Sequence, residues 1–164
     1  MTEDQEVWVF GSQAILGSYP DAPPSLRRSM EVDVCPRNRP EAVDRIDGIL
    51  GEASPFHRTH GFYVHGVPID EAATLPPGWQ ERAIPVRDRV GTRGNTGWCL
   101  EAHDLAASKL VAFRDKDRDF VRLLLVEKLI KSETLEDRIR ALGLAEEEQS
   151  RLLRWVDRTR ADLV

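Results

Sequence analysis

Two acidic side chains lie two residues apart in the short apolar segment MEVDV, residues 30–34. Its valines favour a β-strand, and alternate side chains of a strand share one face. Glu31 and Asp33 therefore point the same way, while the valines beside them point to the other face. Two carboxylates on one face form either a solvated surface or a site for a hard divalent cation such as Mg²⁺.

A Gly-Ser pair follows the first predicted strand. Residues 6–10, EVWVF, are dense in strand formers and stop at Gly11. Glycine lets the backbone approach a ligand closely, and Ser12 is predicted as the N-cap of a short helix over 12–18. Free N–H groups and the dipole at a helix start favour a phosphate group. A phosphate cradle beside two metal-binding carboxylates is the equipment that phosphoryl or nucleotidyl transfer requires.

The elements that position these residues form a predicted α/β region. A Pro-rich loop over 19–29 separates the Gly-Ser pair from the acidic strand, and a helix is predicted over 39–52. Residues 56–70 predict a β-hairpin that turns at a glycine, and residues 82–87 predict a further strand. The Gly-rich segment 88–97 predicts a flexible loop.

The chain changes character near residue 99, where apolar residues begin to recur at helical spacing. Four helices are predicted, over residues 100–114, 117–130, 132–143 and 145–163. The predicted fold class is therefore α+β. We expect an α/β core over residues 1–98 and a helical subdomain over residues 99–164 that completes a shared active-site cleft.

The composition is that of a globular chain of one domain. The 164 residues are 41% hydrophobic and 31% charged, with a net charge of −5, so a nucleic acid would have to meet a local basic patch. No apolar run approaches the roughly 20 residues of a membrane span, and the acidic N-terminus lacks a secretion signal. We therefore expect a cytoplasmic protein with no membrane partner, in which Cys35 and Cys99 are free thiols.

Two segments carry a family resemblance. VFGSQAILGSYPDAPPSLRRSMEVDV, residues 9–34, resembles the Gly-Ser…Asp-x-Asp signature of the DNA polymerase beta-like nucleotidyltransferase superfamily. EAHDLAASKLVAFRDKDRDF, residues 101–120, resembles the helical motif of small bacterial nucleotidyltransferase-like proteins related to the AbiEii and MenT toxins. The resemblance implies a minimal nucleotidyltransferase fold, a mixed sheet with helices, followed by a helical C-terminal subdomain.

The resemblance gives the residues of the first segment roles. Gly11 and Ser12 would bind the triphosphate, and Glu31 and Asp33 would bind the metal. Polymerases of the superfamily use a third strand acid, for which Asp70 is the candidate. The superfamily usually has Asp where this chain has Glu31, and the longer side chain moves a metal ligand, which leaves open whether the site is active.

The second segment would supply the positive charge. Lys109 would contact phosphates or stabilise the charge of the transition state, and Arg114 would bind a phosphate of the nucleotide or of a nucleic acid. Asp117 would orient Lys109 or act as a base. The implied reaction moves a nucleoside monophosphate from an NTP to a tRNA or protein acceptor, with Mg²⁺ or Mn²⁺ as cofactor. A toxin role, with a cognate antitoxin as partner, follows from the same likeness.

Two alternatives stay open. In the first, the chain is a catalytically inactive nucleotidyltransferase-like domain that binds a nucleotide or a partner protein. Glu31, the uncertain third acid and the lack of a helix before the first strand favour this alternative. In the second, the chain is an unrelated α/β domain whose acidic pair is only surface.

Other polar residues give weaker signals. The histidines do not match the spacing of a zinc site, and the sequence does not identify one that faces the cleft; they are His57, His60, His65 and His103. Four arginines flank the acidic strand and form either a solvated loop or an electropositive rim for a phosphate-rich acceptor; they are Arg27, Arg28, Arg37 and Arg39.

Overall fold

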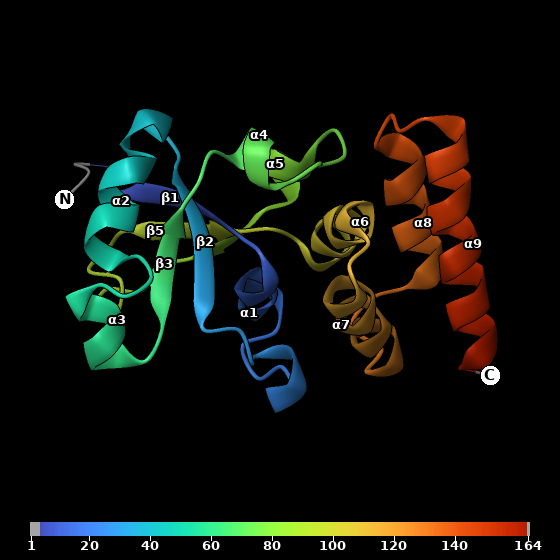
Figure 1. Ribbon diagram of the computed structural model, residues 1–164, viewed down its shortest axis with the longest axis horizontal. Helices are drawn as coiled ribbons and strands as arrows, with labels where there is room; N and C mark the ends of the chain where they lie inside the picture. The colour runs from blue at the N-terminus through green and yellow to red at the C-terminus, as the bar shows by residue number, and fades with distance from the viewer. Residues whose placement is uncertain (1–3, 164) are drawn as a thin grey trace.

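The computed structural model describes residues 4–163, which form a five-stranded mixed sheet with helices (Figure 1). The strand order is β3-β2-β1-β5-β4. The strands are β1 (Glu6–Phe10), β2 (Glu31–Pro36), β3 (Tyr63–Gly66), β4 (Ile84–Val86) and β5 (Thr96–Cys99). β1 pairs antiparallel with β2 and parallel with β5, while β2 and β3 are parallel and β4 and β5 are antiparallel. The predicted α+β class is confirmed.

The helices differ in length between the two ends of the molecule. Those between the strands are short: α1 (Ile15–Ser18), α2 (Val43–Leu50), α3 (Pro55–His60), α4 (Ile69–Ala72) and α5 (Trp79–Arg82). Single 3₁₀ turns cover Ser12–Ala14, Pro24–Leu26 and Pro40–Ala42. The C-terminal helices are longer: α6 (Ala102–Ala112), α7 (Asp115–Val126), α8 (Ser132–Ala141) and α9 (Glu146–Asp162). In Figure 1, α2 and α3 lie at one end of the molecule and α8 and α9 at the other, with the sheet, α6 and α7 between them.

One hydrophobic core joins the sheet to the C-terminal helices. Phe10 from β1 and Ile15 from α1 belong to the same buried cluster as Leu105, Leu124 and Leu152 from the C-terminal helices. Because the two parts bury their apolar faces against each other, residues from both parts can line one pocket. The division into residues 1–98 and 99–164 stays a prediction.

A buried carboxylate also links the two parts. Asp104 on α6 is fully buried, and Arg82 of α5 donates two hydrogen bonds to it, at 2.8 and 3.0 Å. Arg138 Nε of α8 lies 2.9 Å from the same carboxylate, although its N–H is not aligned for a hydrogen bond. Two guanidinium groups therefore offset part of the desolvation of this carboxylate, although burial outweighs them and raises the pKa of Asp104.

Two predictions for residues 56–99 are wrong. Residues 56–70 are not a hairpin, because the Ser54 hydroxyl caps α3 by accepting from the N–H of His57 at 3.1 Å. Gly61, with a φ of 75°, ends this helix, and the following β3 pairs parallel with β2. The loop predicted over 88–97 ends in β5, an interior strand of the sheet that lies between β1 and β4.

Both cysteines are buried and unpaired, as predicted. Burial raises the pKa of the Cys99 thiol to about 11, so this thiol is protonated and unreactive at neutral pH. Within residues 4–163, no helix combines the length and the apolar character that crossing a membrane requires.

Candidate active site

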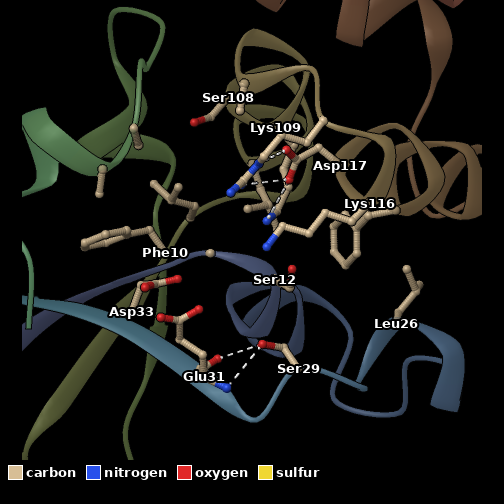
Figure 2. Close-up of a pocket in the computed structure, with 18 of the residues that line it drawn as sticks. Phe10, Ser12, Leu26, Ser29, Glu31, Asp33, Ser108, Lys109, Lys116 and Asp117 are labelled. Carbon is tan, nitrogen blue, oxygen red and sulfur yellow. Dashed lines mark hydrogen bonds and ion pairs between the residues drawn. The ribbon is translucent and has the colours of Figure 1, made fainter. Parts of the chain in front are cut away.

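A pocket of about 740 Å³ lies between the sheet and helices α6 and α7 (Figure 2). This volume is in the range of pockets that hold small-molecule ligands. All predicted site residues except Asp70 line it: Gly11, Ser12, Glu31, Asp33, Lys109, Arg114 and Asp117. The acids of β2 lie on one wall and the cations carried by the helical region lie on the facing wall (Figure 2).

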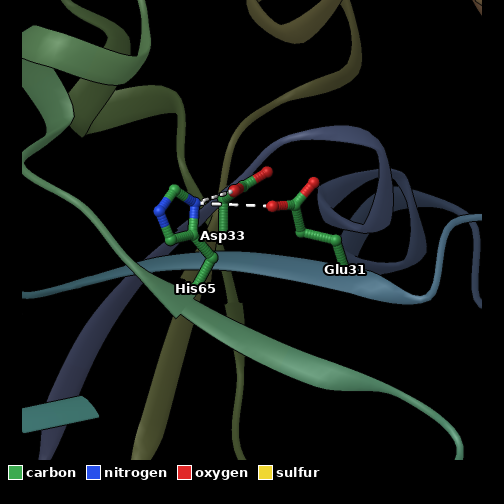
Figure 3. A group of neighbouring side chains, drawn as sticks. All are labelled: Glu31, Asp33 and His65. Atoms are coloured by element: carbon green, nitrogen blue, oxygen red, sulfur yellow. Dashed lines mark hydrogen bonds and ion pairs between the residues drawn. The ribbon is translucent and has the colours of Figure 1, made fainter. Parts of the chain in front are cut away.

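Glu31, Asp33 and His65 form the acidic wall, and their side chains converge (Figure 3). His65 Nδ1 lies 3.1 Å from Asp33 Oδ1 and 3.4 Å from Glu31 Oε1. The parallel pairing of β2 and β3 explains this contact, because it places Asp33 beside His65. The side chain of Asp33 is 22% exposed and those of Glu31 and His65 are about 40% exposed, so a ligand can reach them from solvent.

Gly11 lets the Asp33 carboxylate lie directly against the turn after β1. Its φ of 77° is a conformation that glycine adopts readily and other residues avoid. A Cβ atom at this position would lie 2.0 Å from Asp33 Oδ2. Gly11, not Ser12, is the N-cap of the following 3₁₀ turn, so the predicted capping role of Ser12 is wrong. Ser12 instead lines the pocket beside the acids.

Two side chains fix the start of β2 against this turn. The Ser29 hydroxyl accepts from the N–H of Glu31 at 3.2 Å. The side-chain amide of Gln13 donates to the Ser29 carbonyl at 2.6 Å. The Pro-rich loop therefore returns the chain to the turn from which it departed, and this return places Glu31 next to the Gly-Ser pair.

Lys109, Arg114 and Asp117 form an ion-paired cluster on the helical wall. Helix α6 ends at Ala112, and its C-cap Phe113, with a φ of 53°, turns the chain toward α7. The short connection brings the last turn of α6 against the first turn of α7. Arg114 Nε donates to Asp117 Oδ2 at 2.6 Å, and Lys109 Nζ lies 3.5 Å from Asp117 Oδ1.

The charges in this cluster support one another. Burial alone would raise the pKa of Asp117, but the hydrogen bond from Arg114 and the charge of Lys109 outweigh it and hold this pKa below its usual value. Burial likewise lowers the pKa of Lys109, against the attraction of Asp117. Each carboxylate oxygen of Asp117 has a cationic neighbour. This arrangement suits the orientation of Lys109 better than a role for Asp117 as a base.

Two further cations line the pocket. Neither Arg28 nor Lys116 has a hydrogen bond or ion pair with another side chain in residues 4–163. Arg28 is one of the four arginines considered for an electropositive rim, whereas no role is predicted for Lys116 from the sequence. Arg37, at the other end of β2, pairs with Glu6 at 3.0 Å and does not line the pocket. An anionic ligand would therefore meet uncompensated positive charge at Arg28 and Lys116.

The third ligand-type side chain of the acidic wall is His65 and not Asp70. The chain leaves the sheet after Gly66, and Asp70 is exposed in the short helix α4. Sequence reasoning did not select His65 among the histidines. The signal that identifies it is the strand alternation of β3 combined with the parallel register, and the register becomes visible only in the folded chain.

The acidic wall suits a divalent cation. Within residues 4–163, Glu31, Asp33 and His65 are the only three such side chains whose ligand atoms all lie within 4.8 Å of one another. Carboxylate oxygens and imidazole nitrogen are both metal ligands. These three residues would hold the ion, and the close approach at Gly11 would keep Asp33 in place for it.

One comparison with known proteins identifies a family. The model of a family described as nucleotidyltransferase of unknown function (DUF6036) matches residues 1–160. No curated protein and no solved structure matches the chain. The family match includes both walls of the pocket, whereas the expected relationship to the AbiEii and MenT toxins stays a prediction. This chain therefore belongs to the family of nucleotidyltransferases of unknown function.

Proposed function

We propose that this chain is a Mg²⁺- or Mn²⁺-dependent nucleotidyltransferase that moves a nucleoside monophosphate from an NTP to an acceptor hydroxyl. The observation that carries the proposal is the arrangement of opposite charges across one pocket. Glu31 and Asp33 lie on the sheet wall, and Lys109 lies on the helical wall with the unpaired Lys116 nearby. A triphosphate with its metal needs both kinds of charge in one place.

In this proposal the residues of the chain act by positioning and by neutralising charge. Glu31, Asp33 and His65 would hold the metal, which would supply positive charge against the phosphates and the leaving group. Lys109, oriented by Asp117, contacts the phosphates from the opposite side. The acceptor oxygen attacks the α-phosphorus, and the bond from this phosphorus to the β-phosphate oxygen breaks. Pyrophosphate leaves, and the hydroxyl proton passes to solvent through the open mouth of the pocket.

The acceptor in this proposal is a tRNA or a protein hydroxyl. The likeness to the AbiEii and MenT toxins supports these acceptors, and it supports a toxin role with a cognate antitoxin as partner. The unpaired side chains of Arg28 and Lys116 support binding of an anionic ligand in this pocket. Expression of the wild-type chain and of Asp33→Asn in a bacterial host tests the toxin role, because only the active chain should arrest growth.

A transfer assay tests the reaction. The purified protein is incubated with each α-labelled NTP, Mg²⁺ or Mn²⁺, and total tRNA or a cell lysate. Label should appear on an acceptor with the wild-type chain and should disappear with Asp33→Asn and Lys109→Ala. Asp137→Asn, an exposed substitution on α8 outside the pocket, is the matched control and should keep full transfer. Loss of transfer in this control as well would show that the losses in the other variants are not specific to the pocket.

The inactive nucleotidyltransferase-like domain remains the second candidate. Glu31, in place of the usual Asp, favours it, and so does a histidine where a third acid was expected. Metal-dependent NTP binding without transfer to any acceptor would support this second function. The absence of both binding and transfer would contradict both functions.

A further inference from the structure

We propose that His65 is a direct metal ligand and that it makes the site selective for Mn²⁺ over Mg²⁺. The inference extends the proposed function by naming the metal, and its metal-binding test requires neither an NTP nor an acceptor. It depends on the position of one ring nitrogen relative to two carboxylates.

The geometry of the three side chains suits a shared ion. Two ligands that each lie about 2.1 Å from a metal at a right angle are about 3.0 Å apart. The distances from His65 Nδ1 are 3.1 Å to Asp33 Oδ1 and 3.4 Å to Glu31 Oε1, close to this value. Figure 3 shows that Nδ1 points toward both carboxylates while the other ring nitrogen points away.

The backbone fixes this arrangement from two directions. The parallel ladder sets His65 beside Asp33 on the neighbouring strand. Gly11 supports the other side of Asp33, because the carboxylate lies where a Cβ atom at residue 11 would be. Glu31 has the longer side chain, which lets its carboxylate reach back toward the ring. The replacement of Asp by Glu at this position is thus compatible with a histidine as third ligand.

The donor set determines the preferred metal. Mg²⁺ binds hard oxygen ligands and keeps several waters, so an imidazole contributes little to its affinity. Imidazole nitrogen suits transition metals, whereas carboxylate oxygen suits Mg²⁺, Ca²⁺ and Mn²⁺. Mn²⁺ accepts both the two carboxylates and the ring nitrogen, and it also suits the phosphate oxygens of a nucleotide. The mixed set of Glu31, Asp33 and His65 therefore favours Mn²⁺ over Mg²⁺.

Pulsed electron paramagnetic resonance of the Mn²⁺-loaded protein detects the proposed bond. Modulation by a coordinated ¹⁴N nucleus should appear in the wild-type chain and be absent in His65→Ala. His60→Ala, an exposed histidine on the adjacent helix α3, is the matched control and should keep the nitrogen signal. A wild-type spectrum without coordinated nitrogen, or a signal that persists in His65→Ala, would overturn the proposal.

Titration of the free Mn²⁺ signal gives the affinities, and competition with Mg²⁺ gives the selectivity. His65→Ala should weaken Mn²⁺ binding at least about tenfold, since even the partners of metal ligands contribute 10- to 100-fold. Mg²⁺ binding should change less, so the preference for Mn²⁺ should fall. His65→Asp replaces the imidazole with a carboxylate, so it should strengthen Mg²⁺ binding and reduce the preference further. Equal or tighter Mn²⁺ binding in His65→Ala would show that the ring is only a counter-charge for the acids.

These outcomes differ from those of the transfer assay. Nitrogen coordination without nucleotidyl transfer would keep the metal proposal and remove the enzymatic one. Transfer without nitrogen coordination would do the reverse. Circular dichroism of each variant confirms that the fold is intact, which we expect because the His65 side chain is 42% exposed.

Discussion

The two carboxylates Asp104 and Asp33 lie in contrasting electrostatic environments. Asp104, on α6, is fully buried and has two arginines against it, from α5 and α8. Asp33, on β2, is accessible to solvent and has a second acid beside it. Its one ion pair within residues 4–163 is with the His65 imidazole, while Lys109 and Arg114 act on it from farther away. The first carboxylate is in contact with two arginines, whereas the second has no arginine or lysine in contact with it among residues 4–163.

The contrast separates structural charge from functional charge. A buried ion pair fixes how elements pack, and removing one partner leaves an uncompensated charge. Accessible acids held close together repel each other, and they are retained most simply where a cation binds. The cluster of Lys109, Arg114 and Asp117 lies between these extremes, since it is paired internally and still faces the pocket.

The largest expected effect is a loss of stability when the buried Asp104 is removed. Asp104→Ala leaves Arg82 and Arg138 without their buried partner, and should lower the free energy of unfolding by about 3–5 kcal/mol. Urea denaturation measures this loss. Asp137→Ala removes an exposed partner of Arg140 and should change stability by less than about 0.5 kcal/mol. A loss of similar size in both variants would remove the distinction between the two environments.

Substitution of the accessible Asp33 should reduce activity and leave stability almost unchanged. Asp33→Asn should reduce nucleotidyl transfer by about 100-fold or more, because it removes a charged metal ligand. Its unfolding free energy should stay within about 0.5 kcal/mol of the wild-type value, since the substitution also relieves repulsion from Glu31. A loss of stability as large as that of Asp104→Ala would show that Asp33 has a structural role instead of a functional one.

A pair of glycine substitutions sharpens the comparison at the turn. Gly11 and Gly61 have nearly the same positive φ, 77° and 75°, but only a Cβ atom at Gly11 would meet Asp33. Gly61→Ala should cost about 1–2 kcal/mol, because Gly61 is in the left-handed helical region. Gly11→Ala should cost more, because its ψ of −175° places it in a region that essentially only glycine occupies. Gly11→Ala should also displace the Asp33 carboxylate and weaken Mn²⁺ binding, while Gly61→Ala keeps it. Calorimetric titration with Mn²⁺ measures the difference, and equal metal affinities would contradict the close contact.

The intermediate cluster gives a pH dependence. The pKa of Asp117 in the folded chain lies below its ordinary value of 3.8, because Arg114 and Lys109 outweigh the effect of burial. The unfolded chain therefore binds more protons between the two pKa values. The contribution of Asp117 to stability is fully present above the ordinary value and is lost as the pH falls through the folded one. Unfolding of Asp117→Asn in urea over a pH series should lack this loss, and identical slopes would contradict the pairing.

The smallest expected effect concerns the exposed cations of the pocket. Lys116→Ala should weaken NTP binding about two- to fivefold, because a solvated charge contributes little to an ionic contact. The effect should shrink as salt is added, and stability should not change. Fluorescence titration at two ionic strengths measures it, with Lys131→Ala, which lies outside the pocket, as the control. A larger effect at high salt would exclude a simple electrostatic contact.

Local sequence signals predicted the elements that carry the site. The alternation around Glu31 and Asp33 predicted their common face, and strand formers ending at Gly11 predicted the turn beside them. The Lys109 and Asp117 motif predicted the helical wall through family resemblance. Each of these signals lies within a short segment, so it can be recognised without knowledge of the fold.

The remaining features depend on contacts between distant segments. His65 enters the site through the parallel pairing of β3 with β2, which strand alternation alone does not specify. β5 was missed because Gly97 and the Gly-rich loop before it weaken the strand signal. The hairpin prediction overlooked a local signal, since Ser54 and Pro55 begin a helix that Gly61 ends.

A crystal structure of the protein with Mn²⁺ and a non-hydrolysable NTP analogue would show directly whether this pocket binds both the metal and the nucleotide. Anomalous scattering locates the ion without reference to the protein. We expect a manganese peak bound by Glu31, Asp33 and His65, with the triphosphate between this ion and Lys109. A nucleotide bound elsewhere, or an ion with no contact to Asp33, would contradict the assignment of this pocket as the nucleotidyl transfer site.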